Sequence, residues 1–410
     1  RGFGMIAAMR LLGAIMLLAL TLGPVPATPV APQAPHDGPT VVTNRVRFPV
    51  AIPFPECGST VLIPVQVNGH QKRLFILDSG ANSMALDHRL ADSLGLSPVG
   101  SGAGTGAGQG PVPYRRYARD SVEFEAAGIA IRSDHTISID LSNQPGILGV
   151  SVGGVLGTDF FRAVVVEIDY DAHVVWLHRP GEFIPTADAR AIPLTFARRV
   201  PFVSARLTVP GRPPRERRLL VDSGSEDAVD DSMLLESRGP LRQVTGGVGS
   251  GQTYQVVFGR IERFELGPFT LHDLPSVAPG VSLIGGEVLR RFRVALDYGN
   301  ARMYLAPGRH FSDRSAEDLS GMSLRLTASG ERLRVDEVQR DSPAARAGMV
   351  AGDEIVAIDG APIRDLGLRR ALAILTRPDA RLRVTLAGSS QEREVTLVLP
   401  SARAPSGESR

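Results

Sequence analysis

The chain has a single cysteine, Cys57, among its 410 residues, so no disulfide can form within it. Free cysteines are commonly packed residues, and we expect Cys57 to be one. Without disulfides the fold must be held together by core burial, which a chain of this length permits. Aromatic residues make up only 5% of the sequence and hydrophobic residues 43%, a composition typical of an ordinary globular core.

The chain also lacks a charge excess of either sign. It carries 45 basic and 43 acidic residues, which gives a formal net charge of +2. This balance provides no electrostatic case for nucleic-acid binding. The eight histidines form neither an H-E-x-x-H motif nor a cluster of ligands, so we expect no metal and no other cofactor.

Only one long apolar run is present. Arg10 precedes Leu11–Gly23, a run of about 13 residues, whereas a membrane-spanning helix needs about 20. A basic residue, a short apolar run and the small residues of "PVPATPVA" are typical of a signal peptide. We place it at residues 1–31, followed by a Pro-rich linker at 32–44. The sequence thus predicts an exported protein, periplasmic or secreted, without a stable membrane span after cleavage. An uncleaved membrane anchor is the alternative.

The body of the chain contains an internal repeat. "KRLFILDSGANS" (Lys72–Ser83) and "RRLLVDSGSED" (Arg217–Asp227) each lead an apolar strand into an Asp-Ser-Gly turn. The closing segments of the two copies also align, since "VLG" at Val155–Gly157 corresponds to "LIG" at Leu283–Gly285. A strand-rich half-domain built twice predicts a site on its pseudo-twofold axis, where the two turns can meet.

Two aspartates within hydrogen-bonding distance cannot both ionise comfortably, so such a pair keeps one proton over a range of pH. If Asp78 meets Asp222, the charged member can take a proton from a water while the protonated member donates to a carbonyl oxygen. Asp, Ser and Gly are also ordinary turn residues. An Asp-Ser-Gly triplet is expected by chance only about 0.1–0.2 times in this length, so two copies at matched positions favour a site.

These turns, each followed by a hydrophobic-hydrophobic-Gly segment, resemble those of the pepsin and retropepsin aspartic peptidases, and bacterial two-lobed members exported to the periplasm are the nearest match. The resemblance implies a mostly β, bilobal pepsin-like acid-protease fold, with lobe 1 at 45–183 and lobe 2 at 184–308. It implies that Asp78 and Asp222 are the catalytic dyad. The residues that it implies as support for the two turns are Ser79, Gly80, Ser223 and Gly224, with Leu156-Gly157 and Ile284-Gly285 packed behind them.

The sequence departs from this pattern in two places. The second turn continues with Glu226-Asp227 where the first has Asn82-Ser83, and like charges there can raise the pKa of an aspartate. The family also has a hairpin flap over its cleft. The Gly-rich runs Ser101–Gly110 and Gly246–Tyr254 are our candidates for it.

A rival motif is "GVSVG" at Gly149–Gly153, which satisfies the G-x-S-x-G pattern of serine hydrolases. That motif needs a strand, an elbow and a helix in succession. Only the short "GIL" precedes it here, so we expect an ordinary segment of the repeat instead.

The last part of the chain differs in composition. "DSPAARAGMVAGDEIVAIDGAPI" (Asp341–Ile363) closely resembles PDZ domains, which implies a small α+β module at 319–400, between a linker at 309–318 and a disordered tail at 401–410. In it, Ser342-Pro343 should begin a short helix and Gly348 should end it. The resemblance also implies a loop whose N–H groups capture a peptide C-terminus, formed by Gly321, Met322, Ser323 and Leu324. A PDZ fold that only packs on the lobes is the alternative.

Together these patterns indicate an exported aspartic endopeptidase whose partners are protein or peptide substrates and a C-terminal peptide ligand of the PDZ domain. The alternative is an inert protease fold in a PDZ-mediated peptide-binding or scaffold protein.

The export hypothesis predicts where the mature protein begins. Cleavage behind the apolar run should leave an N-terminus near Thr28 to Pro32. N-terminal sequencing of the native protein should find it there, in a fraction outside the cytoplasm. An unprocessed chain that fractionates with integral membrane proteins would favour the anchor instead.

Overall fold

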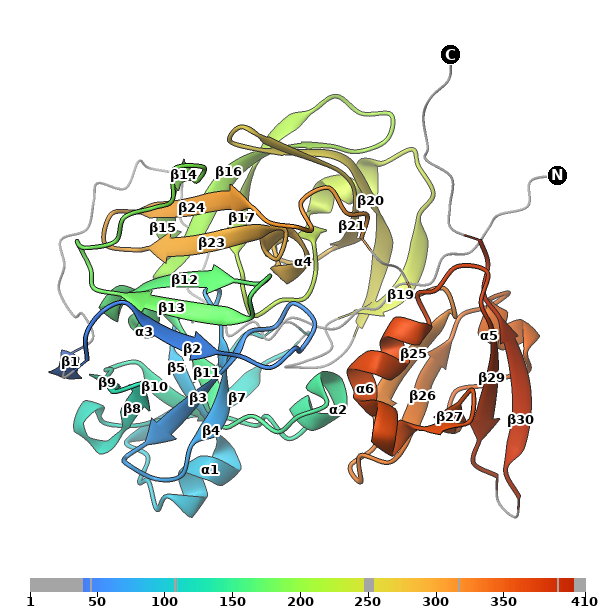
Figure 1. The fold of residues 1–410 in the computed structure, drawn as a ribbon, viewed down its shortest axis with the longest axis horizontal. Helices are drawn as coiled ribbons and strands as arrows, with labels where there is room; N and C mark the ends of the chain where they lie inside the picture. Colours follow the sequence, from blue (N-terminus) through green and yellow to red (C-terminus); the bar gives the residue numbers. More distant parts are fainter. Residues whose placement is uncertain are drawn as a thin grey trace. The chain divides into compact units, whose positions relative to one another are not determined.

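The computed structural model describes residues 40–44, 46–106, 108, 110–246, 254–315, 318–388 and 391–401. Strands dominate it (Figure 1), as the sequence predicted. The chain forms two compact units. The larger contains the described residues up to Ser142 and Val152–Ser315, and the smaller contains Asn143–Ser151 together with the C-terminal residues from 318 onward.

The first repeat of the larger unit forms a ten-stranded sheet. Its strands, in spatial order, are β1 (Thr40–Asn44), β9 (Ile129–Arg132), β8 (Glu123–Ala126), β3 (Leu62–Val67), β4 (Arg73–Leu77), β11 (Gly154–Leu156), β5 (Met84–Asp87), β10 (Thr136–Ile139), β7 (Val112–Arg116) and β6 (Gly100–Gly104). Strand β1 lies within the segment that the sequence assigned to the linker, and it pairs with β9.

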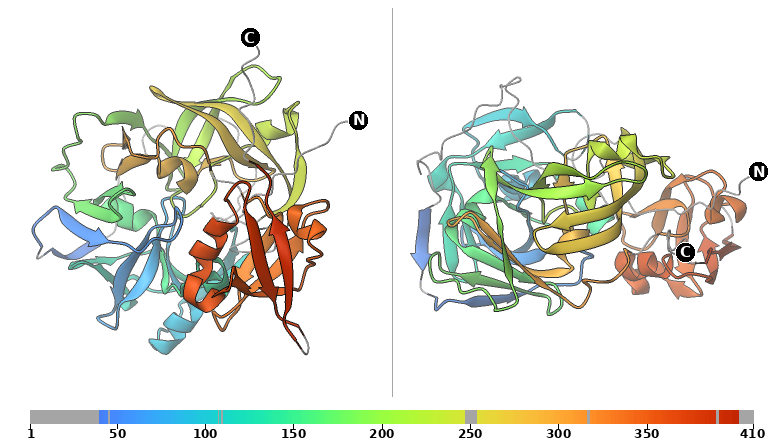
Figure 2. Two further views of the ribbon diagram at one scale, coloured as in Figure 1. Left: turned by 45° about the vertical axis from the view of Figure 1, so that its right-hand side comes forward. Right: turned by 90° about the horizontal axis from the view of Figure 1, so that it is seen from above.

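The second repeat forms an eight-stranded sheet. Its main path runs β18 (Val229–Asp230), β22 (Leu283–Ile284), β17 (Arg215–Val221), β16 (Val200–Thr208), β20 (Tyr254–Leu266) and β19 (Arg242–Gly246), while β15 (Thr195–Ala197) pairs with β16 and β21 (Phe269–Ala278) with β20. In the further views of Figure 2 the blue and cyan strands of the first repeat and the yellow strands of the second form separate sheets.

A six-stranded sheet joins the two repeats. Its order is β14 (Arg190–Pro193), β24 (Arg302–Pro307), β23 (Phe292–Asp297), β12 (Val165–Asp169), β13 (Val174–His178) and β2 (Val50–Pro53). At its centre β12 and β23 run antiparallel, with Val166 opposite Leu296 and Ile168 opposite Val294. These four residues hold matched places in the two repeats, so this pairing lies on the pseudo-twofold axis that the sequence predicted.

Helices in the larger unit are short. They are α1 (His88–Ser93), α3 (Thr158–Ala163), α4 (Gly286–Leu289) and the 3₁₀ turns η1 (Arg119–Ser121) and η2 (Ser232–Glu236). Helix α1 directly follows β5, which is formed by Met84–Asp87. The Asp87 side chain accepts a hydrogen bond from Arg89 N and caps α1 at its N-terminus. None of the helices in the described ranges is long and apolar enough to cross a membrane.

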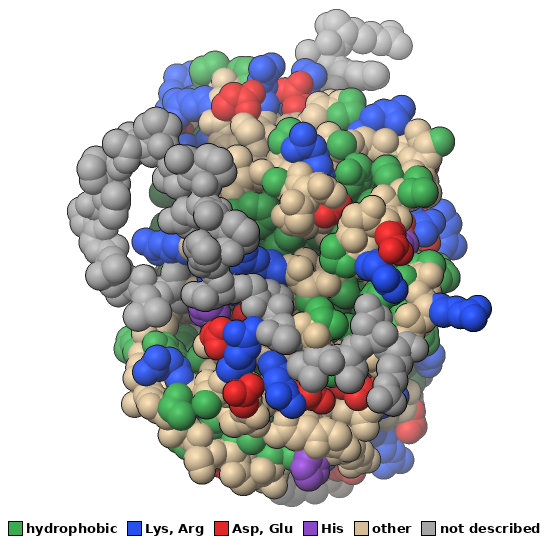
Figure 3. All heavy atoms as spheres, turned by 90° about the vertical axis from the view of Figure 1, so that its left-hand side faces the viewer, with side chains coloured by type: hydrophobic (Ala, Val, Ile, Leu, Met, Phe, Trp, Pro, Cys, Tyr) green, Lys and Arg blue, Asp and Glu red, His purple; other side chains and the backbone are tan. Residues whose placement is uncertain are grey.

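One continuous apolar core runs through both repeats and the joining sheet, from Ile52 to Leu305. Its largest fully buried side chains include Phe75, Phe124, Phe160 and Phe264. Burying a side chain of this size contributes about 1.5–3 kcal/mol, so the larger unit has a core large enough to fold without disulfides. Figure 3 shows basic and acidic side chains interspersed on one face, in keeping with the balanced net charge.

The smaller unit has its own core, which includes Leu333, Ile355, Leu372 and Val384. Its strands are β25 (Met322–Leu326), β26 (Leu333–Val338), β27 (Glu354–Ile358), β29 (Arg381–Leu386) and β30 (Arg393–Val398), with β28 (Ala361–Pro362) beside β27, and its helices are α2 (Gln144–Leu148), α5 (Pro343–Arg346) and α6 (Ile363–Ile374). Ser342 caps α5 by accepting a hydrogen bond from Ala345 N, and Gly348 follows the helix at a φ of 76°. The predicted start and end of this helix are confirmed.

Candidate active site

Two equivalent strand pairs carry the aspartates that the sequence singled out. Strand β4 ends at Leu77 and runs parallel to β11, and Asp78 N donates to Leu156 O at 3.0 Å. In the second repeat β17 runs parallel to β22, and Asp222 N donates to Ile284 O, also at 3.0 Å. The two hydrophobic-Gly segments therefore lie beside the turns, where the resemblance placed them.

The serines join the two turns by reciprocal hydrogen bonds. Ser79 Oγ donates to Val221 O at 2.7 Å and accepts from Ser223 N at 3.0 Å. Ser223 Oγ donates to Leu77 O at 2.8 Å and accepts from Ser79 N at 3.0 Å. Each serine thus ties its own turn to the strand and turn of the other repeat, so the turns cannot separate without breaking four buried hydrogen bonds.

The glycines allow the two carboxyl groups to approach the opposite turns. A Cβ on Gly80 would lie 2.7 Å from Asp222 Cγ, and a Cβ on Gly224 would clash with Asp78 Cγ. Both positions therefore require glycine. Tyr298 adds an asymmetric contact, since its hydroxyl donates to Ser79 O at 3.3 Å.

Both aspartates are fully buried, and one oxygen of each is held by backbone donors. Asp78 Oδ1 accepts from Gly80 N and Ala81 N, and Asp222 Oδ1 accepts from Gly224 N and Ser225 N, at 2.8–3.0 Å. The other oxygen, Oδ2, accepts nothing from any third residue that the structure describes. Each Oδ2 is therefore available to the partner aspartate and to a substrate.

Burial and the charge of Asp222 raise the pKa of Asp78 well above its ordinary value. Burial also raises the pKa of Asp222, but a hydrogen bond from Asp78 and the turn N–H groups hold it to about 6. The pair therefore keeps one proton over a range of pH, and both shifts favour Asp78 as the member that holds it. Because the two groups interact strongly, these pKa values belong to the pair.

The second turn brings further carboxylates that sequence analysis only partly foresaw. Burial, with smaller contributions from the charges of Asp222 and Glu226, raises the pKa of Asp227 to about 7 against the lowering effect of hydrogen bonds with Ser225 and Asp230. Asp230 is also buried, and its pKa is raised well above normal by burial and by Asp227. We expected Glu226-Asp227 to raise the pKa of a dyad aspartate. In the structure, the main causes of the raised pKa of Asp78 are burial and its dyad partner Asp222. The pKa of Asp227 is itself raised. The acidic run "EDAVDD" was the signal for this second pair.

A further buried carboxylate, Asp159, was not predicted from the sequence as part of a site. It accepts hydrogen bonds from Ser133 Oγ and from the Arg199 guanidinium. Burial alone would raise the pKa of Asp159, but a hydrogen bond with His135 and the charge of Arg199 hold it below its ordinary value. Thr158 Oγ1 donates to Arg199 O at 3.0 Å. Asp159 and Thr158 thus fix the hairpin between β15 and β16 to the first repeat.

The two flap candidates differ in what the structure describes. Ser101–Gly110 extends beyond β6, which forms a hairpin with β7 at the edge of the first sheet. Residues 247–253 of the second candidate lie outside the described residues. Tyr254, where β20 begins, donates its hydroxyl to Pro279 O at 3.2 Å. The serine-hydrolase pattern fails structurally, because Ser151 lies between α2 and β11 rather than between a strand and a helix.

In the smaller unit the predicted peptide-binding residues lead into β25. Gly321 has a φ of 78°, and Met322 N donates to Ser320 Oγ at 3.2 Å, so this N–H is already used within the loop. β25 pairs only with β26 in the described sheet, which leaves its other side as an edge. Helix α2 also packs on β25, where a Cβ on Gly146 would lie 2.6 Å from Arg325 Cγ.

Comparison with known families agrees with this organisation. Residues 63–160 match the family model described as aspartyl protease, and residues 334–387 match that of the PDZ domain. The chain therefore contains an aspartyl protease-like domain and a PDZ domain, as the motifs indicated. A search of curated proteins finds no match. The matched protease segment contains Asp78 but ends before Asp222, whose equivalence to Asp78 comes from the twofold geometry.

The Asp227–Asp230 pair predicts a pH effect on stability. A carboxyl whose pKa is raised on folding contributes stability below its unfolded pKa of about 4, and this is lost as pH rises through the folded pKa, about 7 for Asp227. Asp227→Asn keeps the acceptor for Ser225 Oγ but cannot ionise. The free energy of unfolding should then fall less steeply between about pH 4 and 7, by up to about 1.4 kcal/mol per pH unit.

Urea unfolding across this pH range measures that slope. The matched control is Asp120→Asn, since the Asp120 side chain is 87% exposed, and it should leave the slope unchanged. Equal slopes for wild type and Asp227→Asn would contradict a protonated pair.

Proposed function

We propose that this protein is an aspartic endopeptidase that hydrolyses peptide bonds by direct attack of water. The observation that carries the proposal is the buried pair Asp78 and Asp222, held together by reciprocal serine hydrogen bonds and carrying one proton between them. A structural turn has no need of two buried carboxyl groups, which are costly to bury unless they are paired or protonated.

In the proposed first step Asp222 is the ionised member of the pair and Asp78 the protonated one. Asp222, ionised above a pH of about 6, takes a proton from a water placed between the carboxyls, and the resulting hydroxyl attacks the carbonyl carbon of the scissile bond. Asp78, still protonated, donates its proton to the carbonyl oxygen. A tetrahedral diol forms without a covalent bond to the protein.

In the second step the proton now on Asp222 passes to the amide nitrogen, and the C–N bond breaks. One hydroxyl of the diol returns its proton to Asp78, so the products are a carboxylic acid and an amine and the dyad regains its starting state. Tyr298, hydrogen-bonded to Ser79 O, holds the first turn in place during this exchange.

The PDZ domain would supply peptide binding by a different route. The edge of β25 can accept an added strand, and Gly321–Leu324 would receive the C-terminus of the peptide. Since α2 packs on β25, a ligand there would compete with it. Export to the periplasm or beyond, proposed from the N-terminal apolar run, would bring such proteins within reach.

The dyad predicts the effect of two substitutions. Asp78→Asn and Asp222→Asn should each lower kcat/KM by about 10²–10⁴-fold or more, because neither can share a proton as a carboxyl pair does. Wild-type kcat/KM should rise as pH increases through about 6, where Asp222 ionises, and fall only well above that. A pH-resolved digestion of a denatured protein mixture, with and without a pepstatin-type inhibitor, provides the assay.

Asn retains the Oδ1 acceptor for the turn N–H groups, so both variants should keep the wild-type thermal midpoint within a few degrees. Asp92→Asn, at a site where the side chain is 60% exposed, serves as the matched control and should retain full activity. Near-normal turnover in either dyad variant would mean that the two aspartates are not the catalytic pair, and would favour the inert scaffold.

The separate cores predict that the protease unit is catalytically complete without the PDZ domain. A chain ending at Ser315 keeps the contacts of Arg291 with Phe311 O and Ser315 Oγ. It should cleave a short unstructured peptide like the full chain does, and lose activity only on a protein substrate whose free C-terminus docks on the PDZ domain and raises its local concentration. If a soluble, folded truncation lost the short-peptide activity too, the PDZ domain would be part of the catalytic unit.

A further inference from the structure

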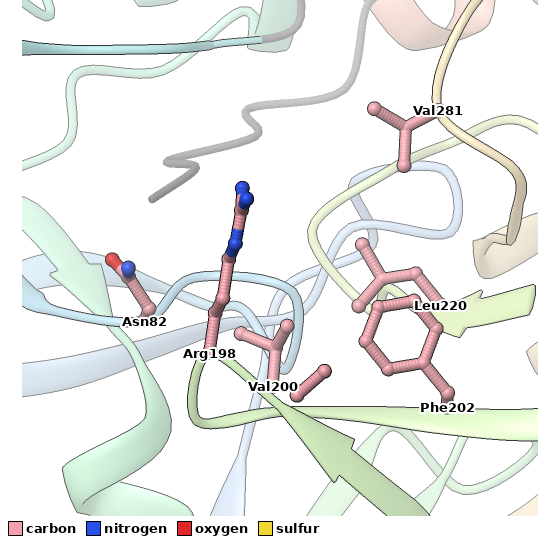
Figure 4. Close-up of a pocket in the computed structure, with 7 residues that line it drawn as sticks. Asn82, Arg198, Val200, Phe202, Leu220 and Val281 are labelled. Atoms are coloured by element: carbon pink, nitrogen blue, oxygen red, sulfur yellow. The ribbon is translucent and has the colours of Figure 1, made fainter. Parts of the chain in front are cut away.

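A cavity of about 180 Å³ has in its wall Leu220 of β17, the strand that leads into the second aspartate turn (Figure 4). Its lining residues are Asn82, Ala197, Arg198, Val200, Phe202, Leu220 and Val281. Leu220 lies two residues before Asp222, and Asn82 lies four residues after Asp78, so each repeat contributes to the cavity wall a residue that is close in sequence to its aspartate. An apolar cavity of about 150 Å³ accommodates a benzene ring. This cavity is therefore large enough for a bulky apolar side chain.

Arg198 is placed at this cavity by an unusual turn. Ala197 pairs with Val200, so Arg198 and Arg199 form a two-residue hairpin loop, and their φ angles are 49° and 75°. Such turns favour Asn-Gly, because positive φ strains other residues. The ion pair of Arg199 with Asp159 holds the strained loop. The consequence is that the Arg198 side chain extends past Val200 on the side toward Asn82 (Figure 4).

Arg198 is exposed, and it has no ion-pair partner in the part of the chain that the structure describes. A guanidinium without a counter-charge at the wall of an apolar cavity can pair with a carboxylate of an incoming peptide. Strained backbone that is retained in this way is common at functional sites.

Because the two repeats are related by a pseudo-twofold axis, each residue of the cavity can be compared with its equivalent on the other side of the dyad. Phe202 pairs with Leu220 in β16 and β17, just as Leu62 pairs with Ile76 in β3 and β4. In the same register Val200 corresponds to Thr60 and Arg198 to Gly58. Val281 corresponds to Gly153 through the pairing of β22 with β17 and of β11 with β4, and Asn82 corresponds to Glu226 through the aligned Asp-Ser-Gly turns.

The two sides therefore differ in both size and charge. Where the second repeat has an aromatic ring, two valines and a cation, the first has Leu62, Thr60 and two glycines. Where the cavity has the neutral amide of Asn82, the other side has the carboxylate of Glu226, which accepts a hydrogen bond from Thr60 Oγ1 at 3.1 Å. Residues that hold the dyad are the same in both repeats, whereas residues that would touch a substrate are not.

We propose that this asymmetry selects the substrate, an inference that rests on the proposed peptidase function. A bulky apolar side chain next to the scissile bond enters the cavity, and an acidic side chain two residues away along the extended peptide pairs with Arg198. In an extended chain, residues i and i+2 point to the same face about 7 Å apart, within reach of an arginine. On the other side of the scissile bond Glu226 disfavours an acidic residue.

The test uses the full chain and two matched peptide sets. The first set carries Phe or Ala next to the scissile bond, and the second carries Glu, Gln or Lys two residues from that position. Each sequence is also made as a non-hydrolysable analogue with a reduced peptide bond, and both cleavage and binding are measured. Phe should be preferred over Ala by at least about 10-fold, and Glu over Lys by roughly two- to five-fold.

Two variants assign these preferences to the cavity. Arg198→Glu should reverse the charge preference to Lys, while Arg263→Glu, the same charge change at an exposed residue of β20, should leave it unchanged. Val281→Phe should fill the cavity and reduce the preference for Phe. A thermal midpoint close to the wild-type value checks that each variant is folded.

The outcomes separate the two proposals. Selective binding of the analogues without cleavage of any peptide would overturn the peptidase function and leave the recognition site standing. Two results would overturn this inference and leave the peptidase function standing. One is equal cleavage of all peptides, whatever residue is at the apolar and charged positions. The other is an unchanged preference for Glu over Lys in Arg198→Glu.

Discussion

The geometry of the site depends on the four hydrogen bonds that Ser79 and Ser223 exchange across the pseudo-twofold axis. Each hydroxyl accepts a backbone N–H from the opposite turn and donates to a carbonyl at the end of the opposite strand, so both of its roles are satisfied away from water. Loss of one hydroxyl leaves a buried N–H and a buried C=O unpaired, at about 1–3 kcal/mol each. Two turns separated by 144 positions in sequence are thereby held as one unit.

This arrangement has an energetic cost, which the core offsets. Asp78, Asp222 and Asp230 are buried, Asp227 is half-buried, and all four have raised pKa values. Each ionisation inside the protein opposes folding, and the continuous core of both repeats supplies the compensating burial. Asp159, which has both a cationic and an imidazole partner, behaves differently. Asp159, beside Arg199, has a lowered pKa. Buried acids of opposite tendency in one unit show that local partners, rather than burial alone, decide which carboxyl stays charged.

The sequence could predict those parts of the fold and site that depend on residues close together in the chain. An apolar run followed by Asp-Ser-Gly predicts a strand that ends in a turn. The repetition of this pattern predicts the axis on which Asp78 and Asp222 meet. The helical start at Ser342-Pro343 was likewise local. Arg198 escaped prediction because its role comes from a hairpin register and from Asp159, which is 39 positions earlier in the chain. In the segment Met84–Leu94, α1 begins only at His88, after its cap Asp87, because Met84–Asp87 pair with β10 and β11 as β5. No local pattern displays those contacts.

The duplicated half explains why the site is symmetric in one respect and asymmetric in another. Shared-proton chemistry needs two equivalent carboxyls held by equivalent turns, so a change in either serine or glycine harms both halves at once. A peptide bound across the axis has a direction, and its two ends present different side chains to the two repeats. Positions such as Arg198 and Gly58, or Asn82 and Glu226, are therefore under no requirement to match. Under the proposed function, the difference between them would let a symmetric pair of aspartates distinguish the two directions of a bound peptide.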